Sequence, residues 1–267
     1  MPIFAATALV CAVLGSGTAA QAAPSPANDV AAVSTTTSPS ESSDVYVVST
    51  AGGTVSNEVH SMATPEAASA LRAQLTAQGK RVLPPGQTFA TAGSTTVSAL
   101  AAACPSYGTA TAWCGHAWAY NGYNDPQVYF LDHTPAGYPV SNATADWYRS
   151  PGIDAYYRSY TQGCPNTRVH CVHVYTYHPA NSGEYGSTYW DPSKPNAVTV
   201  QISDRLRYTT QGRKSTCHEL GHALGLGHNS SSNSCMFTGR AFRSGDSYQP
   251  SSQDFVVLTR IYPYVGT

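Results

Sequence analysis

Charged side chains are scarce in this chain of 267 residues. Asp, Glu, Lys and Arg make up 11% of it, whereas an average soluble domain has about 25%. The formal net charge of −1 provides no basic surface for nucleic acid or for an anionic membrane. Low charge combined with 18 tyrosines also argues against a disordered chain or a coiled coil. We therefore expect a compact protein whose partners include neither nucleic acid nor a membrane.

Two further absences divide the chain. Lysine and arginine are missing before Arg72, and cysteine is missing from residues 23–103. Apart from Cys11, all cysteines lie in the last two-thirds of the sequence: Cys104, Cys114, Cys164, Cys171, Cys217 and Cys235. An even set of six in an exported chain is typical of three disulfides formed in an oxidising compartment, although the count alone leaves the pairing open.

Residues 1–22 have the pattern of a signal peptide. An apolar run is followed by Ala20-Gln21-Ala22, the small-x-small pattern of a cleavage site, although no positive charge precedes the run. The run is too short to span a membrane, and no later segment offers a longer one. We therefore predict a secreted, extracellular protein that is free of the membrane once the signal is cleaved.

Residues 23–103 indicate a pro-segment. Its two ends, 23–43 and 82–103, are rich in Ala, Ser, Thr, Pro and Gly and are expected to be flexible linkers. Between them we expect a short strand at 44–48 and a helix at 64–78, which begins with a threonine cap and ends before a glycine. This composition predicts a small folded piece tethered by two soft linkers.

Residues 104–267 are expected to form the main domain. They hold 17 of the 18 tyrosines, all four tryptophans and eight of the nine histidines. The residue pattern predicts strands and then helices: strands at 127–131, 168–177 and 197–202, and helices at 141–149, 210–224 and 252–261. Because strands come early and helices late, without regular alternation, we predict an α+β fold.

One stretch of the sequence has the pattern of a metal-binding site. His218 and His222 are four residues apart, so on a helix their rings project from one face and can bind one Zn²⁺. Glu219, beside the first ligand, can reach a zinc-bound water. Gly225 can adopt the left-handed conformation that ends a helix and turns the chain. The turn would bring His228 back as a third ligand and leave the fourth position open, as a catalytic zinc requires.

The motif is far more specific than its alternative. In a chain of this composition H-E-x-x-H arises by chance roughly 0.006 times, and the added Gly and His lower this to roughly 2 in 100,000. The alternative is a capping box, in which Thr216 and Glu219 open a helix and the histidines are incidental. Capping does not require His222, Gly225 or His228, so zinc binding is favoured.

From residue 211 to residue 262 the sequence resembles the matrixins, a group of metzincin zinc metalloproteases. HELGHALGLGH is similar to their zinc signature, and Met236 follows at the spacing of the matrixin Met-turn. Asp254 falls where matrixins keep an aspartate that supports the Met-turn or the mature N-terminus. Phe237-Thr238 replaces the usual Tyr-Pro, so a tyrosine zinc ligand is not expected there. Secreted actinobacterial metalloproteases are also similar, but they usually have Asp where His228 stands.

The resemblance implies a metzincin-like zinc protease domain over 104–267, with a twisted mixed sheet, a zinc helix, a Met-turn and a C-terminal helix. It also implies a secreted zinc endopeptidase that acts on protein or peptide substrates, with one Zn²⁺ held by the three histidines. Glu219 would assist the attack of a zinc-bound water on the peptide bond. Met236 would form the floor below the metal without ligating it. We expect the enzyme to be a monomer.

The disulfide pairing follows from position. Helical spacing points Cys217 about 100° away from His218, which favours a disulfide over a thiolate metal ligand. Pairing with Cys235 would tie the zinc helix to the Met-turn. Proximity along the chain suggests the remaining two pairs: Cys104–Cys114 and Cys164–Cys171.

Further metal sites rest on weaker patterns. Three histidines lie in or beside the strand expected at 168–177: His170, His173 and His178. The alternation of side chains along a strand places His173 on the opposite face from His170 and His178, so a second zinc site is disfavoured. Oxygen ligands for Ca²⁺ are available but match no calcium-binding loop: Asp132, Asp191, Asn196 and Asp204. A calcium site therefore remains a hypothesis without support from the spacing.

The sequence leaves open how the expected pro-segment would keep the enzyme latent. Because residues 23–103 lack cysteine, the thiol switch of many matrixin zymogens is absent from this stretch. His60 is the only histidine of the stretch and a candidate blocker of the metal.

Two alternative functions are open. One is a secreted, non-catalytic binding module stabilised by zinc, which would need a fourth protein ligand. Another is a zinc hydrolase that acts on cell-wall peptides.

Overall fold

The computed structural model describes most of the chain from Ser43 onward. The described residues are 43–51, 54–85, 104–191, 198–238 and 243–263. The expected signal peptide at 1–22, Cys11, and nearly all of the two expected linkers lie outside these ranges.

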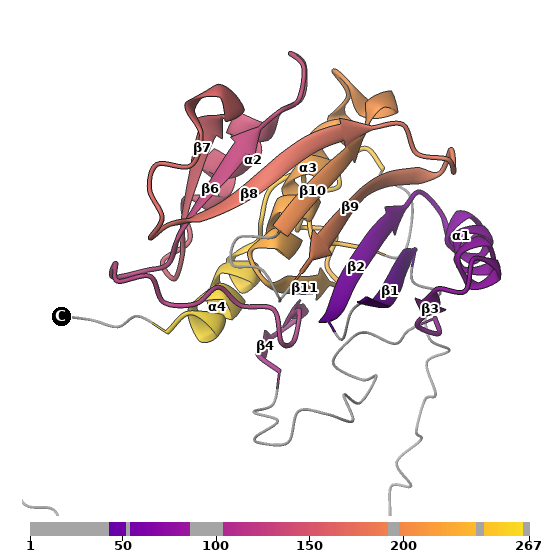
Figure 1. The fold of residues 1–267 in the computed structure, drawn as a ribbon, viewed down its shortest axis with the longest axis horizontal. Helices are drawn as coiled ribbons and strands as arrows, with labels where there is room; N and C mark the ends of the chain where they lie inside the picture. Colours follow the sequence, from indigo (N-terminus) through magenta and orange to yellow (C-terminus); the bar gives the residue numbers. More distant parts are fainter. Residues whose placement is uncertain (1–42, 52–53, 86–103, 192–197, 239–242, 264–267) are drawn as a thin grey trace, which may run out of the picture. The chain divides into compact units, whose positions relative to one another are not determined.

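A mixed sheet of eight strands dominates the described structure, in the order β3-β1-β2-β9-β10-β8-β6-β7 (Figure 1). The strands are β1 (Asp44–Ala51), β2 (Thr54–Met62), β3 (Arg81–Val82), β6 (Gln127–Asp132), β7 (Asp154–Ser159), β8 (His170–Tyr177), β9 (Glu184–Trp190) and β10 (Val198–Ser203). Strands β10, β8, β6 and β7 are parallel, whereas β9 runs antiparallel to β10. The sheet and its helices agree with the α+β prediction.

The helices lie where the sequence predicts them, within a few residues. They are α1 (Pro65–Ala77), α2 (Val140–Trp147), α3 (Thr210–Ala223) and α4 (Ser252–Ile261), with short 3₁₀ turns at Tyr160–Gln162 and Asp204–Leu206. Helix α3 packs on β9, β10 and α2. A small second sheet, in the order β11-β5-β4, packs against α4. Its strands are β4 (Ser106–Tyr107), β5 (Ala110–Ala112) and β11 (Leu226–Asn229).

The core explains both the strand pattern and the weak amphipathic pattern of α3. Val172 and Val174 of β8 and Val200 and Ile202 of β10 are fully buried, as expected for parallel strands covered by helices. Helix α3 is buried from Thr216 to Ala223 on every side, polar residues included. A helix enclosed in this way needs no single apolar face, so its position depends on the partners of its polar side chains.

Residues 43–85, the described part of the expected pro-segment, extend this sheet. Strand β2 pairs antiparallel with β9, and β1 and β3 continue the sheet outward. Helix α1, capped by Thr64, packs on the hairpin of β1 and β2 through a small apolar cluster: Val45, Val47, Met62, Ala68 and Leu71. The described residues from 43 to 263 belong to one compact unit. The sequence predicted a small folded piece here, but not its pairing with the main sheet through β2 and β9.

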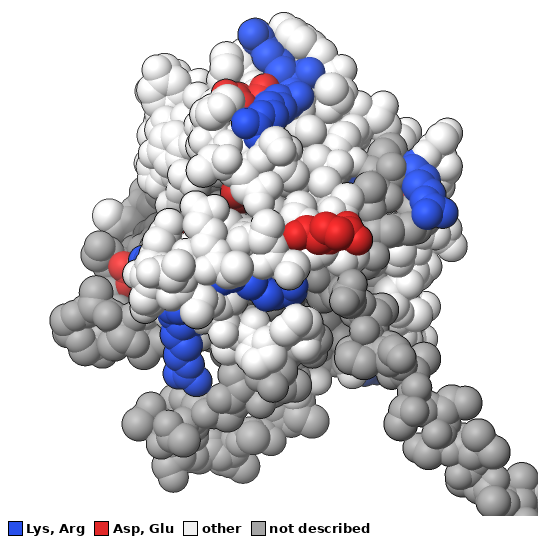
Figure 2. Space-filling model, turned by 90° about the vertical axis from the view of Figure 1, so that its right-hand side faces the viewer, with Lys and Arg blue, Asp and Glu red and all other residues white. Residues whose placement is uncertain are grey.

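The surface reflects the low charge of the sequence. Figure 2 shows a face on which charged side chains are few and most of the surface is uncharged. Within the described ranges, no helix combines the length and the apolar character that crossing a membrane requires.

Candidate metal centre

Helix α3 and the turn after it position three histidines. Thr209 caps the helix by accepting a hydrogen bond from the Gly212 amide. The helix ends at Ala223 with Leu224 as its C-cap, and Gly225 has a φ of +92°. A Cβ at Gly225 would collide with the carbonyl oxygen of His116, so both the backbone conformation and the space require glycine. The sharp turn sends β11 back beside the helix and carries His228 to the site.

The ring nitrogens of the three histidines converge. His222 Nε2 lies 3.0 Å from His218 Nε2 and 3.2 Å from His228 Nε2. His218 Nδ1 lies 2.9 Å from the Cys235 carbonyl oxygen, and His222 Nδ1 lies 2.9 Å from the Leu226 carbonyl oxygen. A carbonyl can only accept, so each Nδ1 carries the proton and the two Nε2 lone pairs face each other. A shared cation satisfies both.

The electrostatics suit a metal ion. Burial lowers the pKa of His222 to about 3, with the neighbouring His228 adding to the effect. Burial likewise lowers the pKa of His228 to about 3 and that of His218 well below its ordinary value. The imidazoles are therefore neutral at physiological pH, the state in which histidine binds Zn²⁺. These three side chains form a candidate metal site, and their donor set fits zinc.

Glu219 lies next to this site in a fully buried position. Its Oε1 accepts a 2.6 Å hydrogen bond from Ser61 Oγ, and its Oε2 accepts a 2.7 Å hydrogen bond from Thr188 Oγ1. A Cβ on Gly186 would lie 2.8 Å from Glu219 Cγ, so the glycine in β9 makes room for this side chain. Burial raises the pKa of Glu219 to about 8, although both hydroxyls oppose the rise. Such a pKa suits a group that exchanges protons near neutral pH.

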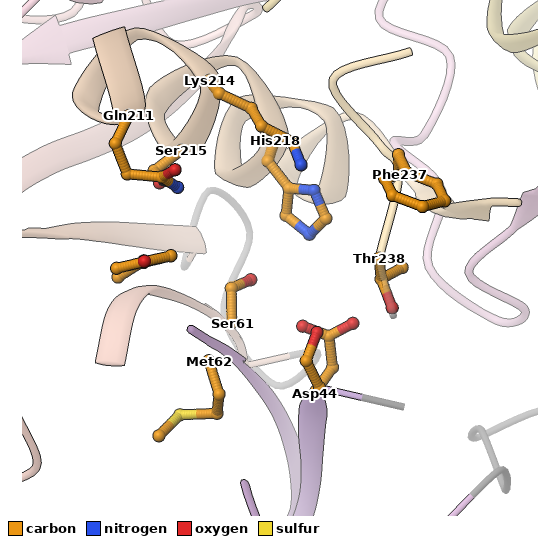
Figure 3. Close-up of a pocket in the computed structure, with 11 residues that line it drawn as sticks. Asp44, Ser61, Met62, Gln211, Lys214, Ser215, His218, Phe237 and Thr238 are labelled. Carbon is orange, nitrogen blue, oxygen red and sulfur yellow. Dashed lines mark hydrogen bonds between the residues drawn. The ribbon is translucent and has the colours of Figure 1, made fainter. Parts of the chain in front are cut away.

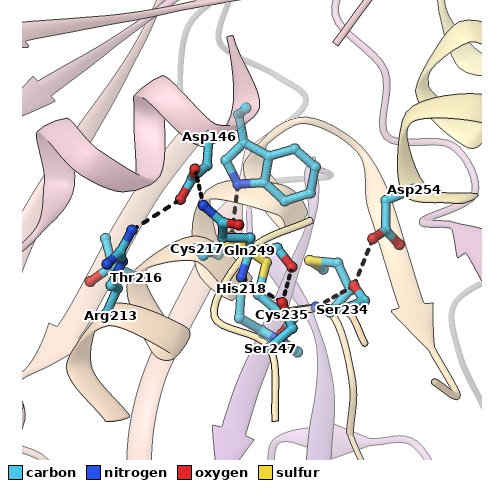
Figure 4. Close-up of a disulfide and its surroundings, with 12 residues drawn as sticks. Asp146, Arg213, Thr216, Cys217, His218, Ser234, Cys235, Ser247, Gln249 and Asp254 are labelled. Carbon is cyan, nitrogen blue, oxygen red and sulfur yellow. Dashed lines mark hydrogen bonds and ion pairs between the residues drawn. A yellow bond between two sulfur atoms is a disulfide. The ribbon is translucent and has the colours of Figure 1, made fainter. Parts of the chain in front are cut away.

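Met236 and Asp254 contact the elements that carry the histidines. Met236 is fully buried, and a Cβ on Gly221 would collide with its sulfur, so the methionine packs directly against α3. Asp254 Oδ2 accepts a 2.6 Å hydrogen bond from Ser234 Oγ, and Oδ1 accepts a 2.8 Å hydrogen bond from Asn229 Nδ2 (Ser234 and Asp254 are labelled in Figure 4). Asp254 thus connects the Met236 turn with the strand that carries His228.

Three disulfides occur in the described residues. They are Cys104–Cys114, Cys164–Cys171 and Cys217–Cys235, with Cα–Cα distances of 5.4, 6.0 and 6.0 Å. Cys217 precedes His218, and Cys235 provides the carbonyl that holds the His218 ring (Figure 4). This disulfide therefore ties the first ligand to the segment that orients it. Cys217 has no thiolate to offer a metal in this state.

Strands β1 and β2 reach the site through residues that the sequence did not single out. Asp44 Oδ2 lies 3.1 Å from His228 Nε2, and Tyr46 Oη lies 2.8 Å from His228 Nδ1. Asp44 and Ser61 line a pocket that also contains His218 and the buried Lys214 (Figure 3). Burial raises the pKa of Asp44 to about 6, although His222 and a hydrogen bond from Thr238 act in the opposite direction.

One signal could have found two of these residues. The strand predicted at 44–48 alternates, so Asp44 and Tyr46 share one face. A carboxylate and a phenol on one face of a strand indicate that this face contacts polar groups. No sequence signal marks Ser61 or Thr188.

His60 does not block the metal. Its Nδ1 lies 2.7 Å from Glu184 Oε1 in β9, and its Nε2 lies 3.3 Å from Glu58 Oε1. Burial by itself would lower the pKa of His60, but the hydrogen bonds with Glu184 and Glu58 raise it to about 10. The hypothesis that His60 faces the histidine triad is therefore wrong. Its imidazolium joins β2 to β9 instead.

The other histidines considered for a second zinc diverge. His170 Nε2 contacts the Ala119 carbonyl oxygen, and His173 Nδ1 lies 2.8 Å from His133 Nε2. His178 Nδ1 pairs with Asp204 Oδ2 at 2.9 Å. Of the other oxygen residues considered for calcium, Asp132 bonds Thr134 and Tyr157. Asn196 lies outside the described residues.

Comparison with protein families finds a match to the part of the sequence that contains this site. Residues 167–263 match the family model "Matrixin". The chain is matrixin-like. The matrixin-like stretch contains α3, β11, the Met236 turn and α4, and it begins well upstream of residue 211. Together with the histidine triad, it supports a zinc-binding metalloprotease.

One solved structure can be set beside this chain. The crystal structure of metalloproteinase-II from Bacteroides fragilis is similar at 10% sequence identity and a TM-score of 0.36, over 82% of this chain and 76% of the other. No curated protein matches the chain.

Removing the disulfide between α3 and the Met236 turn should weaken both the fold and the metal site. For the pair Cys217→Ser and Cys235→Ser we expect a loss of about 3 kcal/mol in the free energy of unfolding, from the chain entropy that the crosslink removes. Metal affinity should fall as well, because the Cys235 carbonyl orients His218. Urea unfolding and zinc titration measure the two effects.

The matched control for the disulfide is Cys164→Ser with Cys171→Ser, which lies away from α3. It should lower stability but leave zinc affinity unchanged. Equal stability of the Cys217/Cys235 variant and the parent would contradict the crosslink.

The His60 imidazolium should make the stability of the full chain depend on alkaline pH. Its folded pKa, about 10, exceeds the ordinary value of 6.5. The stabilisation is therefore complete below pH 6.5 and disappears as the pH rises through 10. Relative to His60→Gln, the parent should lose up to about 1.4 kcal/mol of unfolding free energy per pH unit within this window. Urea unfolding at pH 7, 8, 9 and 10 measures it.

A suitable control for this titration is Glu66→Gln, which alters an exposed carboxylate of the same segment. This variant should show the same dependence of the unfolding free energy on pH as the parent. Parallel pH profiles for the parent and His60→Gln would show that the imidazolium does not hold β2 on β9.

Proposed function

We propose that this chain is the precursor of a secreted zinc endopeptidase in which His218, His222 and His228 hold the metal. The observation that carries the proposal is the pair of Nε2 atoms 3.0 Å apart, each on a ring whose Nδ1 faces a backbone carbonyl. This arrangement places lone pairs against each other and is favourable only around a cation. The matrixin match over the same residues supports the choice of zinc and of proteolysis.

Glu219 would be the general base and acid of the reaction. Zn²⁺ bound by the histidines would polarise the scissile carbonyl and lower the pKa of a water molecule. Glu219 would take a proton from the attacking water and pass it to the leaving amine. Its raised pKa, about 8, supports both transfers. Thr188, which donates to Oε2, would hold the carboxylate in place throughout.

Residues 43–85 would keep the enzyme latent by occupying the edge of β9. Strand β2 pairs with β9 from Asn57 to Met62, and Ser61 is hydrogen-bonded to Glu219. In the described structure, removal of β2 would leave β9 as the edge of the sheet, beside Glu219. An exposed edge strand binds an extended peptide through main-chain hydrogen bonds. Cleavage before Cys104 and release of the segment would thus open the edge to a protein or peptide substrate.

The place of action would be extracellular. The three disulfides suit an oxidising compartment, and the export signal expected at residues 1–22 agrees with it. The closed edge of β9 suits an enzyme that crosses the cell envelope before it becomes active.

Replacing Glu219 by Gln should abolish hydrolysis while keeping the fold and the metal. Gln retains the size, its carbonyl oxygen can accept from one of the two hydroxyls and its NH2 group can donate to the other, but it cannot take a proton. We expect a fall in casein hydrolysis of about 10²- to 10⁴-fold, with unchanged zinc content and melting temperature. The assay uses chains cut at a specific protease sequence placed between Pro85 and Cys104.

The matched control is Asp204→Asn, which removes an exposed carboxylate that pairs with His178. It should hydrolyse casein at the rate of the parent. Parental activity in Glu219→Gln would refute the proposed mechanism.

One observation favours a second candidate function. A non-catalytic module stabilised by zinc needs a fourth protein group at the metal, and Asp44 lies 3.1 Å from His228 Nε2. This module would not hydrolyse any substrate, whether the chain is cut or intact. A panel of casein and cell-wall peptides, with and without the chelator 1,10-phenanthroline, distinguishes the functions. We expect the cut chain to hydrolyse casein and the chelator to stop it; activity confined to cell-wall peptides would indicate a hydrolase of that class.

A further inference from the structure

A buried lysine points into the pocket beside the histidine triad. Lys214 belongs to α3 and precedes His218 by four residues, so the two side chains project from the same face of the helix. The lysine is 5% exposed, and in Figure 3 it extends along His218 toward the pocket. In the described ranges no other lysine or arginine is buried. The fold therefore places a cation next to the first metal ligand.

The contacts of Lys214 hold its ammonium group inside the pocket. Nζ lies 5.3 Å from the centre of the Phe237 ring, within the range of a cation–π contact. A buried ammonium is costly unless an anion compensates it. In the full chain Asp44 lines the same pocket. Burial raises the pKa of Asp44 to about 6, and Lys214 is among the charges that oppose the rise. The pocket is thus already suited to a carboxylate.

The wall of the pocket that residues 104–267 provide is cationic and polar. In the proposed function the pocket loses the hairpin residues that line it: Ser43, Asp44, Ser61 and Met62. The other lining residues are Tyr185, Gln211, Lys214, Ser215, His218, Phe237 and Thr238. These described residues supply an ammonium, hydroxyls and an amide, and neither aspartate nor glutamate is among them. A substrate side chain that complements this wall carries a negative charge.

The pairing of β2 with β9 indicates which part of a substrate reaches the pocket. Strand β2 runs antiparallel to β9, from Asn57 opposite Trp190 to its last residues, Ser61 and Met62, which line the pocket. Ser61 also donates a hydrogen bond to Glu219. A substrate strand that pairs with β9 in the same direction would therefore enter the pocket with the residue that follows the bond held at Glu219.

We propose that Lys214 makes the enzyme prefer substrates with an acidic side chain, Glu or Asp, directly after the cleaved bond. This inference rests on the proposed endopeptidase function and names its substrate class. The ammonium would donate a charge-assisted hydrogen bond to the substrate carboxylate in a pocket that excludes most water. Thr238, which hydrogen-bonds the Asp44 side chain in the full chain, is placed to donate to the same carboxylate (Figure 3).

The kinetic test uses two quenched fluorescent peptides that differ in one side chain, Glu or Gln, directly after the cleaved bond. Their common sequence is taken from the casein bond that the chain, cut between Pro85 and Cys104, hydrolyses fastest. We expect kcat/KM to be about 10- to 100-fold higher for the Glu peptide, mainly through a lower KM. In Lys214→Met and in Lys214→Gln the two peptides should be hydrolysed alike, whereas Lys214→Arg should retain a preference for Glu.

The control, Arg205→Gln, removes an exposed cation that does not line the pocket and should keep the Glu preference of the parent. Melting temperature and zinc content show that each variant is folded. Equal kcat/KM values for the two peptides in the parent would overturn the role of Lys214. An undiminished preference in Lys214→Met would overturn it as well, and so would a preference for Glu only before the cleaved bond.

Binding without hydrolysis separates this inference from the proposed function. The cut chain carrying Glu219→Gln is titrated with fluorescent peptides that have the sequence of residues 56–61 followed by Glu or by Gln. Fluorescence anisotropy should show tighter binding of the Glu peptide by the same factor, and Lys214→Met should remove the difference. Equal affinities in the parent would contradict the Lys214 preference. A Lys214-dependent difference in a chain that hydrolyses neither casein nor any peptide would instead refute the proposed function and retain the acid-binding pocket.

Discussion

The structure depends on two imidazole nitrogens that face each other. His218 Nε2 and His222 Nε2 are 3.0 Å apart, and each ring is held by a backbone carbonyl on its far side. The two carbonyls come from Cys235, which the disulfide ties to α3, and from Leu226, which follows the Gly225 turn. Much of the matrixin-like stretch therefore serves to hold lone pairs in an arrangement that only a cation makes favourable.

The second constraint is the edge of β9. Glu219 lies against this strand through Thr188 and the space left by Gly186, so a strand that pairs with β9 also lies beside the Glu219 carboxylate. In the full chain the partner is β2, whose Ser61 reaches Glu219. In the proposed function the same edge would serve latency and substrate binding, because both use main-chain pairing and differ only in the strand that is present.

The sequence predicted the elements that have a strong local pattern. Helices α3 and α4 have caps and clear ends, and β6, β8 and β10 have apolar residues suited to the core. Strands β2, β7 and β9 were missed, because residues such as TVSNEVHSM and EYGSTYW have few aliphatic side chains and gain their stability from pairing with neighbours. Because β2 and β9 have no clear strand pattern, their pairing was not predicted. The hairpin of β1 and β2 was therefore expected to belong to a small folded piece tethered by linkers.

By itself the sequence determined the three histidines and Glu219, because they lie within one helix and one turn, where spacing decides which side chains meet. The resemblance to matrixins also indicated Met236 and Asp254, and position along the chain indicated the three cysteine pairs. Only the tertiary structure decided that Asp44, Tyr46 and Ser61 meet this site. Ser61 and Glu219 are separated by 158 residues and Tyr46 and His228 by 182. Such contacts depend on the register of β2 against β9, and no local pattern encodes a register between distant strands.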